Sequence, residues 1–293
     1  MMSRQQQQIR TFASSVLPVI LGSLLLAAPP FAAAQNDGSN GPPNVLVIQR
    51  EFLKPGKAGS THETTERAFV NAMTAAHSTS YYFAMDSMSG PSRSLFFQAY
   101  PSFEAWEKDT QTVRKDATLT AAIDHASLMD GEMLTSYDQG VFAMRPDLSL
   151  RNGNLKGMRY MEIMRFDIKP GHEKEWEDLV KMYVDGFGKA VPEAHWTTFQ
   201  MMYGSSEGGV FLALIPLKSL RETDASIGNS RKFGESMAPE AMKRLSELTA
   251  ASVKSSMVNL YEFNPRISYP RPEWIADEPD FWKPAPPQKS KGK

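Results

Sequence analysis

The chain has 293 residues, of which 41% are hydrophobic, and its formal net charge at pH 7 is −1. It contains no cysteine, which excludes disulfides, thiolate chemistry and a lipid-modified cysteine anchor, so its stability must come from an ordinary apolar core. No basic block or stripe is present to pair with phosphates, and we therefore expect no nucleic-acid partner.

The first 34 residues have the three-part layout of a secretory signal. Arg4 and Arg10 precede an apolar stretch over residues 13–28, and three alanines stand directly before Gln35. A membrane anchor is the alternative, but serines and prolines interrupt the stretch, whereas a span needs about 20 unbroken apolar residues. We therefore expect a signal peptide over 1–34, a periplasmic or secreted mature chain, and no membrane association once the signal is removed.

A polar linker over residues 35–43 precedes a first folded unit, which we expect to span 44–145. The pattern of apolar runs and turn residues predicts the order β-α-β-β-α-β, which gives an antiparallel sheet with helices on one face. The expected elements are a strand over 45–48 ended by Lys54-Pro55-Gly56, a helix over 60–76, strands over 81–88 and 95–100, a helical region after Pro101, and a last strand over 132–144.

The same order repeats in a second unit over residues 158–265, after a linker over 146–157. Lys169-Pro170-Gly171 lies 115 residues after the first Lys-Pro-Gly turn, and Arg50 and Arg165 keep the same separation. Because the matches fall on a strand end, a turn, a later strand and a helix start without a gap, they indicate a duplication. Each sheet would leave one face uncovered, so we predict that the two units pack sheet to sheet.

Residues 266–293 form a proline-rich arm and tail that contain several aromatic side chains, among them Tyr269, Trp274 and Trp282. Because so much aromatic surface seldom stays in water, we expect 266–282 to dock on the body or on a second copy. A floppy tail is the alternative. One functional hypothesis is therefore an interaction module whose arm clamps a partner or a second copy in a homodimer.

The segment Tyr160–Trp176, with the sequence YMEIMRFDIKPGHEKEW, resembles a known family pattern. It is similar to the opening strand, K-P-G turn and acidic helix start of the antibiotic-biosynthesis-monooxygenase-like and NIPSNAP-like families of the dimeric α/β-barrel superfamily. The resemblance implies an α+β fold in which two tandem ferredoxin-like βαββαβ units pack sheet to sheet as an intrachain dimeric α/β-barrel. It also implies a choice of roles, because the superfamily includes cofactor-independent oxygenases, haem enzymes and isomerases.

Arg50 and Arg165 stand at equivalent ends of the two first strands and are candidates for a ligand site. They could bind an anionic ligand by fork-shaped hydrogen bonding, or they could be rim residues that pair with nearby acids. Glu162 is a candidate through the family pattern alone. NIPSNAP-like strands carry an arginine two residues after this glutamate, whereas here Met164 holds that position and Arg165 is displaced by one.

Tyr81 and Trp196 are likewise equivalent and open the second strands, with His195 beside Trp196. They could form aromatic walls around a flat organic molecule, or they could simply close a core. His195 stands where the first copy has Ser80, so the two walls have diverged. We expect a function to use such unequal residues, most of all on the side of the second copy.

Two acidic helix starts, over 62–66 and 172–178, each contain one histidine. Neither has a second histidine one turn away, and the helix dipole explains the acids, so we expect no metal site. No phosphate loop, dinucleotide fingerprint or nucleophile motif is present, and we expect no cofactor.

The leading hypothesis is an exported protein that binds a small apolar or aromatic molecule between its sheets. The alternative is a cofactor-independent monooxygenase-like or haem-binding enzyme, and whether the chain is an enzyme is left open.

Overall fold

The computed structural model describes residues 41–153, 155–204 and 209–283. The expected signal peptide and most of the first linker lie outside these residues. No helix in the described ranges is both long enough and apolar enough to cross a membrane.

The first copy has the expected order, except that its second helical region consists of two helices. Its elements are β1 (Val45–Leu53), α1 (Ser60–Ala75), β2 (Phe83–Ser87), β3 (Arg93–Tyr100), α2 (Phe103–Lys115), α3 (Ala117–Gly131) and β4 (Leu134–Met144). The break falls at Asp116, whose backbone is extended and whose side chain accepts a hydrogen bond from the Leu119 amide. Asp116 therefore ends α2 and serves as the N-cap of α3.

The second copy follows the same plan after a short 3₁₀ turn over Pro146–Leu148 in the linker. Its elements are β5 (Tyr160–Ile168), α4 (Glu173–Ala190), β6 (Thr197–Tyr203), β7 (Val210–Leu217), α5 (Arg221–Ser236), α6 (Pro239–Ser252) and β8 (Val253–Phe263). The Lys-Pro-Gly turns of both copies hold their glycines in the left-handed region, with φ of 78° at Gly56 and 81° at Gly171. This conformation is one that glycine adopts without strain.

The eight strands form one closed barrel in the order β1-β3-β2-β8-β5-β7-β6-β4. The pairs β2–β8 and β4–β6 join the two copies, and every neighbouring pair is antiparallel. The expected intrachain dimeric α/β-barrel is confirmed by this closure. Because neighbours alternate in direction, β1, β2, β5 and β6 all begin at the same end of the barrel.

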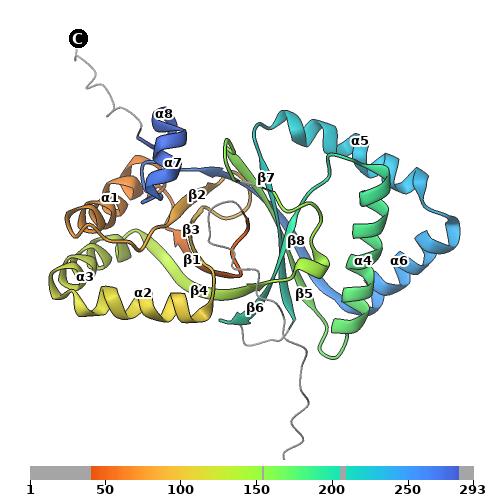
Figure 1. Cartoon of the computed structure of the whole chain (residues 1–293), viewed down its shortest axis with the longest axis horizontal. Helices are drawn as coiled ribbons and strands as arrows, with labels where there is room; N and C mark the ends of the chain where they lie inside the picture. Colours follow the sequence, from red (N-terminus) through yellow and green to blue (C-terminus); the bar gives the residue numbers. More distant parts are fainter. Residues whose placement is uncertain (1–40, 154, 205–208, 284–293) are drawn as a thin grey trace, which may run out of the picture. The chain divides into compact units, whose positions relative to one another are not determined.

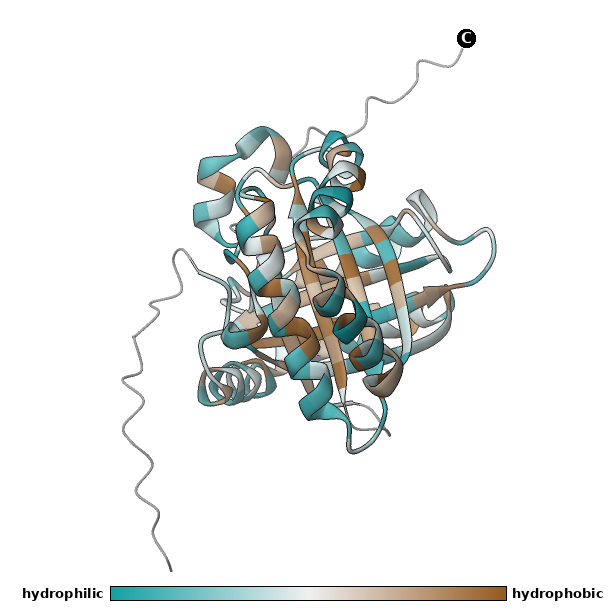
Figure 2. Cartoon of the chain, turned by 90° about the vertical axis from the view of Figure 1, so that its right-hand side faces the viewer, coloured by the Kyte–Doolittle hydropathy of each residue, from teal (hydrophilic) through white to brown (hydrophobic). Residues whose placement is uncertain are grey.

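Side chains alternate between the inside of the barrel and the helical layers. Leu46 and Ile48 on β1 belong to the same core cluster as Met161 and Ile163 on β5, whereas Val47 belongs to an outer cluster. Helices α1–α3 cover one side of the barrel and α4–α6 cover the other (Figure 1). In the view onto α4–α6, the strands behind these helices are largely hydrophobic (Figure 2).

The C-terminal arm packs against the barrel, the docked arrangement that its aromatic content predicted. It contains the short helices α7 (Pro272–Asp277) and α8 (Pro279–Trp282). Ile267 is fully buried, Trp282 is 6% exposed, and Tyr269 exchanges two backbone hydrogen bonds of 2.9 Å with Tyr82. The aromatic side chains of the arm thus extend the core of their own chain.

Candidate functional site

A cavity of about 160 Å³ lies at the barrel end where β1, β2, β5 and β6 begin. Both copies contribute inward-facing apolar side chains to its wall, and the arm contributes Trp274 and Arg271. The barrel residues that line it most directly include Leu46, Phe83 and Phe97 from the first copy, and Met161, Phe199 and Leu214 from the second. The cavity is therefore built jointly by the two copies and lies between them.

Aromatic rings dominate the first-copy side of this cavity. Phe83 stacks on Phe97 with ring centroids 4.9 Å apart, and Trp274 of the arm lies 5.6 Å from Phe83. Tyr81 also lines the cavity, stacked on Tyr269 at 5.5 Å. The exposed guanidinium of Arg271 lies 5.8 Å from the Tyr81 ring centroid, so a cation stands among the residues that line the cavity.

Arg50 and Arg165 also face inward, but they lie at the opposite end of the barrel, where β1 and β5 end. Arg50 Nε is 2.5 Å from Oδ1 of Asp138, which lies opposite it on the neighbouring strand β4. Arg165 Nη2 is 2.7 Å from Oδ1 of Asp167 on the same strand. Each guanidinium is thus paired with a carboxylate, as expected if the two arginines are rim residues that pair with nearby acids. Neither arginine lines the cavity.

The other sequence candidates also lie away from the cavity wall. The Trp196 indole donates to the Leu148 carbonyl at 2.9 Å, and its ring packs edge-on against Phe187. Both ring nitrogens of His195 lie 2.9 Å from backbone carbonyl oxygens. Glu162 is on the outer face of β5, where burial raises the pKa of its carboxyl. Of the six candidate residues, the structure places only Tyr81 at the cavity.

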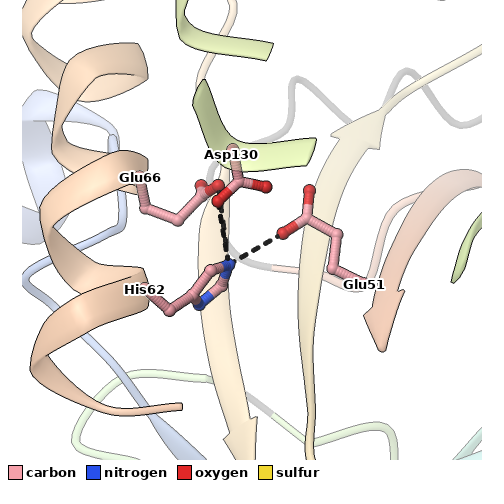
Figure 3. Close-up of side chains that lie close together, drawn as sticks. All are labelled: Glu51, His62, Glu66 and Asp130. Atoms are coloured by element: carbon pink, nitrogen blue, oxygen red, sulfur yellow. Dashed lines mark hydrogen bonds and ion pairs between the residues drawn. The ribbon is translucent and has the colours of Figure 1, made fainter. Parts of the chain in front are cut away.

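A cluster of buried polar side chains lies outside the barrel, between its wall and the helices of the first copy. It brings together Glu51 from β1, His62 and Glu66 from α1, and Asp130 from α3, all 2–3% exposed (Figure 3). His62 Nε2 lies 3.1 Å from Glu51 Oε2, 3.4 Å from Asp130 Oδ1 and 3.7 Å from Glu66 Oε1. We call these four residues the His62 cluster.

The buried carboxyls of the His62 cluster have perturbed protonation equilibria. Burial raises the pKa of Glu51, although the hydrogen bond with His62 opposes the shift. Burial and the charges of Glu51 and Asp130 raise the pKa of Glu66 well above its ordinary value. Burial lowers the pKa of His62, but the Glu51 hydrogen bond and the neighbouring carboxylates outweigh it, so the net shift is upward. Strong mutual perturbation in one enclosed place is typical of functional sites.

The sequence contained part of the signal for the His62 cluster. His62 and Glu66 are four residues apart and so lie on one face of α1, and Glu51 alternates with the inward-facing Arg50. One helical turn after His62 the sequence has a carboxylate, Glu66, where a second histidine would have indicated a metal site. The expectation of no metal site depended on the missing second histidine, and it stays a prediction.

Comparison with known proteins gives structural neighbours but no family. No family model matches the sequence, and no curated protein matches it. The chain is similar in structure to a suggested monooxygenase from Fusobacterium nucleatum, at 11% identity over 76% of this chain and 93% of that one, with a TM-score of 0.49. It is also similar to an anthrone oxidase-like protein, at 15% identity over 75% and 91% of the two chains, with a TM-score of 0.46.

A mutant chlorite dismutase from Candidatus Nitrospira defluvii is a third neighbour, at 8% identity over 77% of this chain and 92% of that one, with a TM-score of 0.42. Such low values transfer no activity and no residue role to this chain. Its fold is established by its own strand order.

Proposed function

We propose that this chain is an exported protein, periplasmic or secreted, that binds a small apolar or aromatic molecule in the cavity between its two copies. The observation that carries the proposal is a cavity of about 160 Å³ whose wall is formed by apolar side chains of both copies. A dry apolar cavity of about 150 Å³ takes up a single benzene ring. The size and lining therefore suit a molecule built on one ring.

The opening of the cavity suggests how such a molecule would be oriented. Phe83, Phe97 and Trp274 offer ring faces and edges that favour stacking on a flat ligand. Arg271 is the cation at the opening, and it would favour a ligand with an acidic or electron-rich substituent directed outward. The expected ligand class is thus a monocyclic aromatic molecule with at most one polar group.

The residues at the cavity do not fit a haem. Among the described residues that line it there is no histidine, and His195 is engaged with two backbone carbonyls. The described cavity wall therefore lacks the histidine that serves as the proximal haem ligand in globins and peroxidases. We assign binding to the cavity and derive no reaction for it.

The test is a binding measurement with phenol and toluene as probes on the purified mature chain. Saturation-transfer NMR should detect both probes. Leu214→Trp, which places a larger side chain in the cavity wall, should abolish the signal. Ile227→Trp is the matched control, because Ile227 is 71% exposed on α5.

Circular dichroism establishes that both variants are folded, and Leu214→Phe replaces Leu214→Trp if the larger residue prevents folding. Equal probe binding by wild type and the cavity variant would refute the assignment, as would absence of binding by folded wild-type protein. Export is tested separately by expressing the full chain and measuring the mass of the mature form, which should begin at Gln35.

A further inference from the structure

We propose that Glu51, His62, Glu66 and Asp130 bind one divalent transition-metal ion, with Zn²⁺ the best match, as a structural site of the first copy. The site is separate from the cavity and independent of the function proposed for it. Three carboxylate oxygens and one imidazole nitrogen make up its ligand set.

The dimensions of the His62 cluster match those of a four-coordinate ion. All four potential ligand atoms lie within 4.8 Å of one another, and the three distances from His62 Nε2 run from 3.1 to 3.7 Å. In a tetrahedral site with bonds of about 2.0–2.2 Å to N and O, ligand atoms stand roughly 3.3–3.6 Å apart. The widest spacing of these atoms, up to 4.8 Å, would have to close by roughly 1.2 Å to complete the coordination.

The carboxylate of Glu66 also indicates a missing ligand. Its Oε1 atom is buried, has no hydrogen-bond partner among the described residues, and lies 3.7 Å from His62 Nε2 within the cluster (Figure 3). A buried carboxylate oxygen is almost always hydrogen-bonded, and leaving one unsatisfied is costly. A metal ion between Glu66 and its neighbours would supply the missing interaction.

The surrounding hydrogen bonds prepare His62 to be a ligand. Ser94 Oγ donates its proton to Asp86 Oδ1 at 2.5 Å, so it can only accept from His62 Nδ1, which lies 3.4 Å away. With a proton on Nδ1, a metal ion that displaces the proton which Nε2 shares with Glu51 would meet the Nε2 lone pair directed into the cluster. Metal-binding histidines are held in this way, by a hydrogen bond from the other ring nitrogen.

The carboxylates have outer partners as well. Gln49 Nε2 donates to Glu51 Oε1 at 2.7 Å, and Thr65 Oγ1 donates to Asp130 Oδ1 at 2.6 Å. These neutral donors orient the two carboxylates but contribute no positive charge. Three buried acids beside one imidazole thus lack a cation of matching charge among the contacts described, and a dication would offset most of that deficit.

The burial of the ligands indicates a structural role. All four side chains are 2–3% exposed and all four coordination positions would be taken by protein, which is the pattern of closed structural zinc sites. The ligands come from β1, α1 and α3, so the ion would fasten both helices to the barrel wall.

The test uses the purified mature chain, stripped with EDTA and then titrated with ZnCl₂ in a calorimeter. We expect one Zn²⁺ per chain by elemental analysis, weaker binding of Mn²⁺, and a higher thermal midpoint with Zn²⁺ than without. Glu66→Gln keeps the shape of the side chain but removes its charge, and it should weaken Zn²⁺ binding by at least about 100-fold, because loss of an outer partner alone costs 10–100-fold.

Glu175→Gln is the matched control. Glu175 lies 3.5 Å from His172 on the second copy, and both side chains are solvent-accessible, so this variant should bind Zn²⁺ like wild type. Equal affinities of the two variants would show surface binding only and would overturn the proposal. So would a folded wild-type chain that retains no Zn²⁺.

Two further measurements test the ligand set of the ion. If Glu66→Gln does not fold, Asp130→Asn removes another ligand and is judged by the same criterion. X-ray absorption of the zinc-loaded wild type should show one imidazole in the first shell, and two or more would contradict the assigned ligand set.

Discussion

The space between the first strand and its helices holds polar side chains in one copy and aromatic side chains in the other. In the first copy, the space between β1 and its helices holds the His62 cluster. In the second, Phe166 stands at the place of Glu51 and packs 4.6 Å from Trp176, which in turn lies 5.5 Å from Phe211. Lys181 stands at the place of Glu66. The same backbone plan thus fastens its helices by polar contacts in one copy and by aromatic packing in the other, so the repeat preserved the architecture and not the interaction.

The largest expected effect is loss of the aromatic contact in the second copy. Trp176 is 3% exposed, so Trp176→Ala should lower the free energy of unfolding by about 3–5 kcal/mol, measured by urea denaturation. Trp176→Phe should cost less, because it keeps a ring in the cluster and removes an indole N–H that is buried without a partner in the described part of the chain. If the two variants were equally destabilised, lost ring packing would not be the cause.

Next in size is the effect of Zn²⁺ on the first copy. At a free concentration of 100 times the dissociation constant, Zn²⁺ should raise the free energy of unfolding of wild type by about 2.7 kcal/mol. Trp176→Ala should retain the same increment, because Trp176 lies on α4 of the second copy whereas the ion would be bound by β1, α1 and α3, and the effects of distant sites add. A smaller increment in Trp176→Ala would show that the copies are energetically coupled at these places.

A cap that divides the first copy's helical region should have a smaller effect. Asp116 accepts the Leu119 amide hydrogen bond at 2.9 Å, and Asp116→Ala should cost about 1 kcal/mol in urea denaturation. The second copy begins the corresponding helix with Pro239 and shows no side-chain cap there. Ala238→Gly at that junction is the control and should not lower the free energy of unfolding, because glycine ranks above alanine as an N-cap residue. Equal losses would mean that capping does not distinguish the copies.

The smallest effect concerns the arm and depends on pH. Burial raises the pKa of Glu278, but hydrogen bonds from Arg159 and the Gly157 amide outweigh it, so the net shift is downward. A depressed pKa means that the carboxylate stabilises the fold above its ordinary pKa of 4.5, and that this contribution is lost as the pH falls through the lower folded-state value.

Glu278→Gln should therefore remove a contribution of no more than about 1 kcal/mol at pH 7 and reduce the pH dependence below 4.5. The pH dependence of the arm is followed by the fluorescence of Trp274 and Trp282 during an acid titration. An unchanged acid titration in Glu278→Gln would contradict the assignment to this ion pair.

Much of the fold was readable because it depends on local signals. The two Lys-Pro-Gly turns and the apolar strands predicted both copies and their packing, but the division of the second helical region into two helices was missed in each copy. The ligand candidates fared differently, because a strand pattern tells which face a residue occupies and not which end of a barrel. Arg50 and Arg165 do face inward, yet they lie at the end away from the cavity.

The His62 cluster shows a second limit of the sequence. Its residues come from one strand and two helices, and Asp130 reaches the others only because α3 packs beside α1 on the barrel. No spacing along the chain encodes that neighbourhood. The expectation that function would favour the second copy's side stays a prediction, while the most strongly perturbed buried acids lie in the first copy.

The order of the strands also has a consequence for how the chain folds. β8 is made last, yet it pairs with β2 as well as β5, and Met85 lies opposite Phe263 in that ladder. The sheet of the first copy therefore stays open until the final strand is available, and contacts this distant in sequence slow folding. The two copies, although repeated in sequence, should fold as one cooperative unit, and a chain cut between them should yield two sheets with unpaired edges rather than two stable domains.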